Sequence, residues 1–327
     1  MTSRRTLLEA TAALACTTLG GFARAQSPAK LARMVVPFPA GGGSDAAARA
    51  LGERIREHFP GGLIVDNRPG AAGRLGIESV KNAEPDGLTM MFVPDFVLTI
   101  YPHSYQRLKY DPLADFTPVA QCARSSYVLA AGPGLPATVA DVKQLVAWWK
   151  DNPRQALIAN NSAGSPTHFA AVMLARSAGV EVTHVSYKGG APAIQDLLGG
   201  QVPVSINPVG EVLPHTKGGR LRVLATTGAQ RDRFMLDSPT MAEAGYPDVA
   251  AVSWLGVLMP RQAPAEWVQR TAAAIDAAVQ RPDLRDAFAG FGMDTTRSTP
   301  AAMAAAMRSE LDRWGAVVKA SGFSAQD

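Results

Sequence analysis

A glycine-rich loop near the start of the chain carries the most informative chemistry. Residues 40–45 read Ala-Gly-Gly-Gly-Ser-Asp and lie between a short apolar run and a segment of helical composition. Glycine lets a backbone N–H group approach a ligand without a Cβ in the way. A helix start adds unpaired N–H donors and a partial positive charge, which favour a carboxylate or a phosphate. The same residues also fit a tight turn in which Ser44 only caps the helix, and the sequence leaves both interpretations open.

A second loop has the same arrangement in the other half of the chain. Residues 160–168 follow an apolar run and lead into a helix that should begin near Pro166, with Ser165 as its N-cap. Two such helix starts would face each other across a cleft and hold a carboxylate between them. His168 is either a ligand contact or a solvent-exposed residue of the first turn.

A third loop, residues 94–101, adds an acidic and an aromatic side chain. Ionised Asp95 and Asp45 accept hydrogen bonds but do not donate them. A bare dicarboxylate near both would meet like charge, so we expect a ligand with a cationic, amide or hydroxyl group besides its carboxylate. Phe38 and Phe96 would stack on a ring, which also allows an aromatic acid. Alternatively, Asp45 only stabilises the start of its own helix, and Asp95 does not face the ligand. The predicted ligand contacts of the three loops are Phe38, Ala40, Gly41, Gly42, Gly43, Ser44, Asp45, Asp95, Phe96, Ser162, Gly164, Ser165, Thr167 and His168.

Catalytic and metal-binding patterns are missing from the sequence. It contains no His-Glu-x-x-His, no Gly-x-Ser-x-Gly and no Gly-Lys-Ser/Thr, and the glycine loop does not have the spacing of a dinucleotide-binding motif. The two cysteines are too few for a disulfide framework, and Cys122 has the surroundings of a buried small hydrophobe. We therefore expect no catalytic residues, no metal, no cofactor and no enzymatic activity.

The elements that must position these loops alternate between strand and helix, which predicts an α/β fold with parallel sheets covered on both faces. In such sheets ligands bind beyond the carboxyl ends of the strands, where the loops above lie. The final third is mostly helical. Strands are expected at residues 34–38, 62–65, 88–93, 127–131, 156–159, 182–186, 202–206 and 221–226. Helices are expected at residues 46–58, 73–83, 139–150, 167–178, 191–198, around 213, and at 265–280, 282–289 and 300–320.

Composition limits the class of protein. The 327 residues are 47% hydrophobic and 18% charged, which is typical of a globular chain. The net charge of +4 comes with no long basic block, so we expect no nucleic-acid partner. No run beyond the N-terminus is apolar over the roughly 18 residues that a membrane span needs.

The first 25 residues have the pattern of an export signal. Arg4 and Arg5 form a short basic region within a twin-arginine-like stretch, and an apolar stretch to Phe22 follows. Ala23-Arg24-Ala25 fits a cleavage site before Gln26. Alternatives are an ordinary N-terminal helix or lipid attachment at Cys16. The signal predicts a soluble protein in the periplasm.

The chain resembles the Bug-type extracytoplasmic solute receptors, the substrate-binding proteins of tripartite tricarboxylate transporters. The similarity covers nearly all of the mature chain in several ordered stretches. These are 37–45 with Arg49, 67–73, 85–89, 115–119, Gly164-Ser165 with His168, 187–192, Pro239-Thr240 with 243–245, and 254–256. Three places differ from the family pattern, namely Val172, Pro203 and the loop at 94–96, and we expect these to alter the ligand more than the fold.

The resemblance implies a two-lobed periplasmic-binding-protein fold (type II-like), in which two doubly wound sheets flank a cleft. We expect one lobe from residues 26–124 plus 252–327 and the other from 125–251. The loop at 39–45 would hold one end of the ligand through backbone groups and water, and the loop at 164–168 the other end. The expected function is capture of a small organic acid (a dicarboxylate, an amino acid or an aromatic acid) for membrane transporter subunits. One alternative is a ligand-sensing receptor for a membrane sensor protein, and a second is an extracytoplasmic enzyme. We expect the protein to be a monomer.

Overall fold

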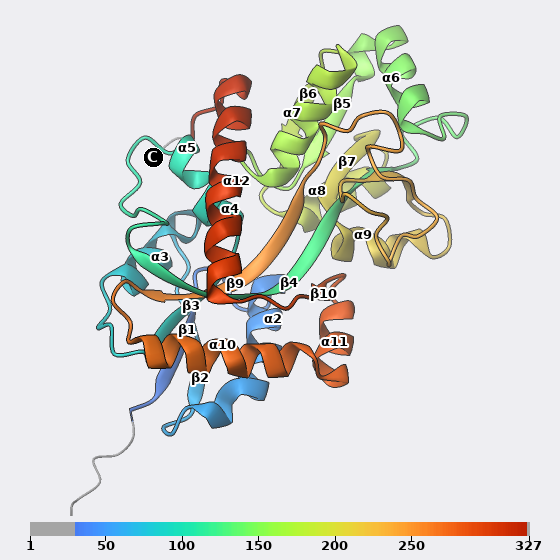
Figure 1. Cartoon of the computed structure of the whole chain (residues 1–327). Coiled ribbons are helices and arrows are strands. Elements are labelled where there is room, and N and C mark those ends of the chain that lie inside the picture. Colours follow the sequence, from blue (N-terminus) through green and yellow to red (C-terminus); the bar gives the residue numbers. More distant parts are fainter. Residues whose placement is uncertain (1–29, 326–327) are drawn as a thin grey trace, which may run out of the picture. The chain divides into compact units, whose positions relative to one another are not determined.

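The structure is a computed structural model that describes residues 30–325 (Figure 1). The predicted signal peptide, its cleavage site and Cys16 lie outside the described residues. Within residues 30–325, ten strands form one sheet, in which eight strands follow one hydrogen-bonded path and β8 and β10 pair with β4 beside it. The path begins at β2 and runs through β1, β3, β9, β4, β7 and β5 to β6.

The first lobe is built around three parallel strands. β1 lies between β2 and β3, and Met34 of β1 pairs with Val65 on one side and Met90 on the other. Met34 contributes to the core that α2 covers, whereas Val35 contributes to the core that contains Ile77 of α3. Successive side chains of a strand point to opposite faces, so burial of both requires a helix on each face. The elements are β1 (Ala32–Val36), α2 (Gly43–Ile55), β2 (Leu63–Asn67), α3 (Arg74–Lys81), β3 (Thr89–Pro94), α4 (Phe96–Thr99) and α5 (Tyr101–Ser104), with 3₁₀ turns at Arg56–His58 and Ala71–Gly73.

The second lobe repeats this arrangement. β5 pairs in parallel with β6 and β7, and Ile158 and Ala159 of β5 contribute to two different cores. Phe169 of α7 belongs to the first of these cores and Ile194 of α8 to the second. The elements are α6 (Val142–Asp151), β5 (Leu157–Asn160), α7 (Pro166–Ala178), β6 (Thr183–Ser186), α8 (Gly190–Leu198), β7 (Val204–Pro208), α9 (Val209–Thr216) and β8 (Arg222–Thr226), with a 3₁₀ turn at Pro153–Gln155.

Two long antiparallel strands connect the lobes. β4 (Phe116–Ala131) pairs with β9 (Val252–Pro260) from Phe116 to Ser126, and from Tyr127 onward it pairs with β7 and β8. β9 also pairs with β3, so β4 and β9 join the parallel strands of the two lobes into one ladder (Figure 1). The lobe boundaries near residues 124 and 252 stay a prediction.

The segment after β9, from residue 261 to residue 325, is helical apart from a two-residue strand. α12 is 22 residues long, and it reaches both cores. Met303 and Met307 near its start pack with the first lobe, whereas Trp314 and Val318 belong to a core of the second. α12 thus packs against both groups of parallel strands. The elements are α10 (Ala265–Val279), α11 (Pro282–Ala289), β10 (Asp294–Thr295) and α12 (Pro300–Ser321).

Several predicted elements need correction. β4 begins eleven residues before the predicted strand, because polar residues such as Gln121 and Arg124 interrupt the apolar pattern of its first part. β9 was not predicted from the sequence, although this strand is apolar apart from Ser253. The parallel strands of the two lobes therefore belong to one mixed sheet, whereas two separate doubly wound sheets were expected. Ser44 is not the N-cap of α2, because the helix already begins at Gly43 and Gly42 is the cap. Ser165 is the N-cap of α7, as predicted.

None of the helices within residues 30–325 combines the length and the apolar character that crossing a membrane would need. Cys122 is buried and unpaired, and its thiol contacts the carbonyl oxygen of Leu255 at 3.2 Å. This agrees with the prediction that it is a small core residue.

Candidate ligand-binding site

A cavity of about 800 Å³ lies where the carboxyl ends of strands from both lobes meet. This volume is typical of a small-molecule site. Three helices of nine or more residues begin at its wall, namely α2, α7 and α8. The sequence predicted the first two of these helix starts as parts of the site and did not predict the third. The lining residues at the helix starts are Gly42, Gly43 and Ser44, then Gly164, Ser165, Pro166 and Thr167, then Gly189 and Gly190.

Asp45 fixes the shape of the loop that precedes α2. Its carboxylate accepts hydrogen bonds from the Gly41 N–H at 2.9 Å, from Asn67 Nδ2 at 2.9 Å and from Arg49 Nε at 3.1 Å. Burial acts to raise the pKa of Asp45, but the bonds from Arg49, Gly41 and Asn67 outweigh it and hold the pKa below its usual value. Asp45 is buried and does not line the cavity. Its position therefore matches the structural alternative, in which it serves its own helix start.

Hydrogen bonds among its own side chains hold the loop before α7. Ser165 Oγ caps the helix by accepting from the His168 N–H at 3.3 Å, and it donates to the Ser162 carbonyl at 2.6 Å. Thr167 Oγ1 donates to Asn161 Oδ1 at 2.8 Å. The N–H groups of Gly164, Ser165 and His168 are used within this braced loop and Pro166 has none, so the Thr167 N–H is the donor that this helix start can offer to an anion.

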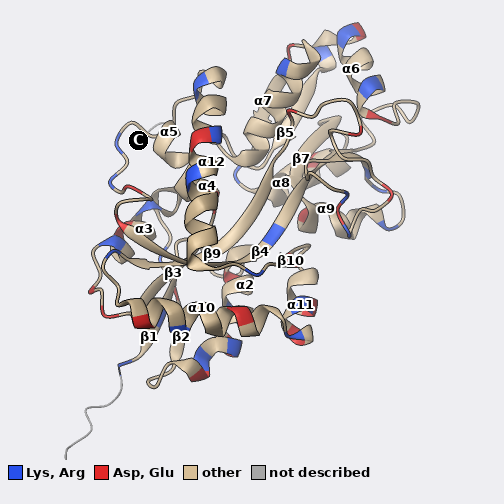
Figure 2. Cartoon of the chain, in the orientation of Figure 1, with Lys and Arg blue, Asp and Glu red and all other residues tan. Residues whose placement is uncertain are grey.

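Two charged residues line the cavity, and the sequence analysis predicted neither as a contact. Arg124 projects from β4 and is exposed, with one hydrogen bond from its Nη2 to Gln121 Oε1 at 3.3 Å. Glu211 lies in the first turn of α9. Charged positions of both signs are otherwise interspersed over the helices (Figure 2). An isolated arginine in a strand and a glutamate in a helix carry no motif, so only the fold brings them to one cavity.

Aromatic side chains make up much of the remaining wall. The rings of Phe38 and Phe96 lie 6.2 Å apart between centroids, and Phe96 meets Tyr101 edge to face at 5.5 Å. Both Phe38 and Phe96 line the cavity, and their predicted stacking on a ligand ring stays a prediction. The aromatic lining residues are Phe38, Phe96, Tyr101, Tyr105, Tyr127, Trp254, Phe291 and Phe323.

Asp95 lies behind this wall rather than in it. It is fully buried, and Oδ1 accepts from Ser253 Oγ at 2.8 Å and from the Trp254 N–H at 3.3 Å. Burial and the charge of Glu310 raise the pKa of Asp95 to about 8, against the effect of these hydrogen bonds. The carboxyl group of Asp95 is therefore mostly neutral near pH 7. The prediction of a ligand with a donor group assumed that an ionised Asp95 faces the ligand, and this assumption is wrong.

The structure thus divides the predicted contacts into two sets. Those that line the cavity are Phe38, Gly42, Gly43, Ser44, Phe96, Ser162, Gly164, Ser165 and Thr167. Those that do not line it are Ala40, Gly41, Asp45, Asp95 and His168. Ala40 and Gly41 are exposed on the outer side of their loop, and the other three are buried.

His168 supports its loop from behind. Its Nδ1 accepts from the Gly164 N–H at 3.1 Å, and its ring meets that of His184 edge to face at 5.1 Å. Burial and the neighbouring His184 lower the pKa of His168 to about 4, and burial also lowers the pKa of His184. Both rings are therefore neutral at pH 7, and His168 is not the solvent-exposed residue of the alternative interpretation.

This pair predicts an acid-sensitive fold. An unfolded chain protonates histidine near pH 6.5, whereas the folded protein takes up that proton at His168 only near pH 4. Stability should therefore fall as pH drops from about 6.5 to 4. His168→Asn keeps an acceptor for Gly164 but does not titrate, so its melting temperature should fall less over this range than that of the wild type. Thermal melts from pH 7 to pH 4 test this, and equal decreases would contradict it.

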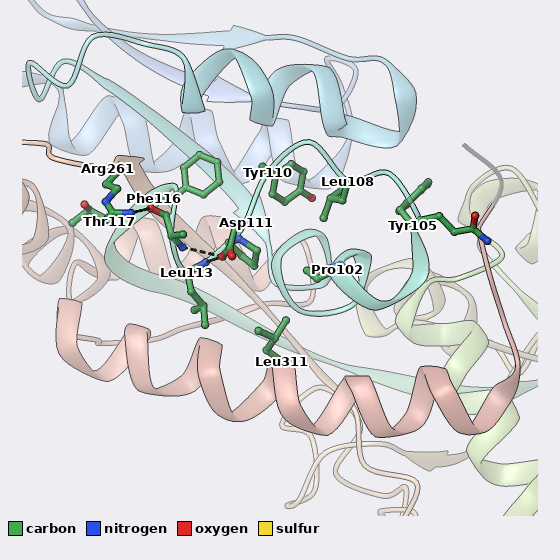
Figure 3. A pocket seen from close by; sticks show the side chains of 13 residues that line it. Pro102, Tyr105, Leu108, Tyr110, Asp111, Leu113, Phe116, Thr117, Arg261 and Leu311 are labelled. Atoms are coloured by element: carbon green, nitrogen blue, oxygen red, sulfur yellow. Dashed lines mark hydrogen bonds between the residues drawn. The ribbon is translucent and has the colours of Figure 1, made fainter.

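A second pocket of about 810 Å³ lies between the loop after α5 and α12 (Figure 3). Its charged groups are already used within the loop. Arg261 Nη1 donates to the Ala114 carbonyl at 2.9 Å, and Asp111 Oδ1 accepts from the Leu113 and Ala114 N–H groups. The first cavity, which we take as the ligand site, combines an arginine with three helix starts, whereas the second pocket is lined by one side of α12 and the loop after α5. Among residues 30–325, no cluster of three or more His, Cys, Asp or Glu side chains is arranged to hold a metal ion.

Comparison with known sequences identifies the protein family. The model of the family described as "Tripartite tricarboxylate transporter family receptor" matches residues 47–323. The "UPF0065 protein in tcbD-tcbE intergenic region" of Pseudomonas sp. strain P51 is 34% identical over 290 residues, which are 88% of this chain and 85% of that protein. BugT of Bordetella pertussis is 31% identical over 296 residues, which are 90% of both chains.

Solved structures share the fold over nearly their whole length. Rpa4515 of R. palustris with adipate has a TM-score of 0.80 and 31% identity, and the match covers 90% of this chain and 98% of that chain. MatC from Rhodopseudomonas palustris with bound malate has a TM-score of 0.77 and 27% identity, over 89% and 100% of the two chains. The periplasmic binding protein BugD has a TM-score of 0.78 and 28% identity, over 92% and 100%. These matches confirm the predicted two-lobed fold.

Proposed function

Because this chain belongs to the receptor family of tripartite tricarboxylate transporters, whose members bind solutes, we propose that it captures a small carboxylate-bearing organic acid. It would do so in the periplasm and deliver the acid to the membrane subunits of a transporter of this type. The named periplasmic location of BugD supports the compartment. The predicted export signal supports it independently.

The observation that carries this proposal is the convergence of Arg124 and three helix starts on one cavity. Arg124 supplies a full positive charge, and its guanidinium matches the geometry of a carboxylate. The helix starts supply backbone N–H donors with partial positive charge. We propose that the ligand carboxylate lies among these groups, in contact with Gly42, Gly43 and Ser44 or with Ser165 and Thr167.

Two structural neighbours have ligands of this class. One is a complex with adipate and another a complex with malate, and both ligands are dicarboxylates. They support a carboxylate in the cavity of this protein. The side chains that line this cavity determine which further groups the ligand carries. Binding of an acid needs only the donors described above.

The proposal predicts a loss of affinity when the charge of Arg124 is removed. Arg124→Gln should weaken acid binding about ten- to a hundredfold, because a hydrogen bond to a charged group contributes ~1.5–3 kcal/mol. Isothermal titration against mono-, di- and tricarboxylates measures this. Arg308→Gln on the exposed face of α12 is the matched control and should leave affinity unchanged.

A wild-type protein that bound only uncharged sugars would refute the proposal. Native mass spectrometry of protein purified without added ligand is an independent check, since a co-purified acid would show its mass. Continued full-strength binding by Arg124→Gln would place the carboxylate at the helix starts alone.

A further inference from the structure

Glu211 is an acid held in the wall of a cavity proposed to bind acids. Two features fix its carboxylate. Asn207, which is fully buried at the end of β7, donates from Nδ2 to Glu211 Oε2 at 2.9 Å. Gly190, the first residue of α8, leaves the space that the carboxylate occupies, since a Cβ there would lie 1.9 Å from Oε2. The carboxylate therefore lies at the positive end of α8, where a negative charge is favoured.

One oxygen of Glu211 remains available to a ligand. Oε2 is used by Asn207, whereas Oε1 accepts no hydrogen bond from any residue within 30–325. Burial raises the pKa of Glu211, and the bond from Asn207 acts in the opposite direction by stabilising the charged form. An ionised carboxylate only accepts hydrogen bonds, so this part of the wall favours a donor. A second carboxylate placed there would meet like charge in a partly desolvated cavity.

The aromatic side chains of the wall favour a ring as the central part of the ligand, between its two polar ends. Phe38 and Phe96 form a tilted pair at one wall, and Phe323 and Trp254 contribute elsewhere. Aromatic side chains prefer to contact other rings edge to face or offset, which adds about 0.5–1.5 kcal/mol beyond burial. A flexible aliphatic diacid would use little of this surface, whereas a ring would use it fully.

We propose that Glu211 makes the cavity selective for an aromatic monocarboxylic acid that carries a hydroxyl or amino group on its ring. The carboxylate would lie among Arg124 and the helix starts, the ring between the aromatic side chains, and the ring substituent would donate to Glu211 Oε1. This assignment rests on the proposed function as an acid receptor and specifies the ligand class of the same cavity.

Isothermal titration of the wild-type protein with a panel of acids tests the assignment. The probes are 3- and 4-hydroxybenzoate, benzoate without the donor, terephthalate with a second carboxylate, and adipate without the ring. We expect at least one hydroxybenzoate to bind at least tenfold more tightly than benzoate, terephthalate and adipate.

Variants then assign the preference to Glu211. In Glu211→Gln the neutral amide both donates and accepts, so the ratio of hydroxybenzoate to terephthalate affinity should fall at least tenfold. Gly190→Ala places a methyl group where the carboxylate lies, and it should reduce the same ratio by moving Glu211. Glu266→Gln, on the exposed first turn of α10, is the matched control and should keep the wild-type ratio.

The outcomes separate this inference from the proposed function. Binding of benzoate, terephthalate or adipate as tightly as the hydroxybenzoates would overturn the role of Glu211 and leave an acid receptor. A preference that survives unchanged in Glu211→Gln would also overturn it. Failure of every acid, with binding of uncharged solutes instead, would reject the acid receptor itself.

Discussion

Leucine in place of Gly42 should abolish ligand binding while leaving the fold intact. Gly42 is the N-cap of α2 with φ −78° and ψ 167°, a conformation open to any residue. A Cβ at Gly42 would have the Pro39 carbonyl oxygen as its nearest neighbour, at 3.6 Å. A leucine side chain would therefore fit the protein but occupy the cavity beside the helix start. We expect at least a hundredfold loss of affinity with a melting temperature lowered by no more than a few degrees, since leucine is a poorer N-cap than glycine.

Two variants in the same loop are the controls. Ala40→Leu adds the same bulk at an exposed residue that does not line the cavity, so it should bind as the wild type does. Ser44→Ala should weaken binding only a few-fold, because the N–H groups rather than the hydroxyl are expected to hold the carboxylate. Titration calorimetry and thermal melts measure both properties. Tight binding by Gly42→Leu would show that no ligand reaches the start of α2.

The second large effect is expected at Gly210, which meets Phe291 and Gly292 across the cavity edge. A Cβ on Gly210 would lie 2.1 Å from the Phe291 carbonyl oxygen, and a Cβ on Gly292 would lie 2.5 Å from Gly210 Cα. These backbones come from α9 in the second lobe and from the loop after α11, whose helix packs in the first. Even alanine at residue 210 would prevent this approach. Since binding proteins close around their ligands, we expect Gly210→Ala to stay folded and to bind at least a hundredfold more weakly.

Small-angle scattering with and without ligand distinguishes the causes. The wild type should become more compact on binding, and Gly210→Ala should not. Gly52→Ala within α2 is the matched control, because its Cβ would meet Val65 at an ordinary 3.6 Å. Unfolding of Gly210→Ala at room temperature would instead make this glycine pair a requirement of the fold.

The parallel units of each lobe could be predicted from the sequence, and the strands that join them could not. Strands such as β3 are buried on both faces and therefore form continuous apolar runs. The first part of β4 contains Pro118, Gln121 and Arg124, and this mixture carries no strand pattern. β4 and β9 border the cavity and contribute Arg124, Ser125 and Ser253 to the site, whereas Gln121 is buried and does not line it. The two strands that the sequence did not delimit are therefore among those that build the site.

The helix starts were predictable because their chemistry is local. A glycine loop or a Ser-Pro pair acts through the backbone of its own helix, and Ser165 caps α7 as predicted. Side chains whose positions depend on residues far away in the sequence could not be placed from the sequence. Asp95 lies beside ligand loops in the sequence, but Ser253 and Trp254 of β9 enclose it. Glu211 is placed by Asn207 and Gly190, and no spacing within the sequence connects it to Arg124.

The uninterrupted course of β4 has a mechanical consequence. Between Ser126 and Tyr127 the strand changes its partner from β9 to β7 and β8, yet it remains extended. Its pairing shifts register between Gln121 and Ala123 before this point and between Leu129 and Ala130 after it, so a change in the angle between the lobes meets irregular strand on both sides but no flexible loop. It must be distributed as small torsions over several residues, as in a twisted elastic ribbon. A joint of this kind exerts a restoring torque, so part of the free energy of ligand capture would be stored in the twist of β4 and returned when the ligand leaves.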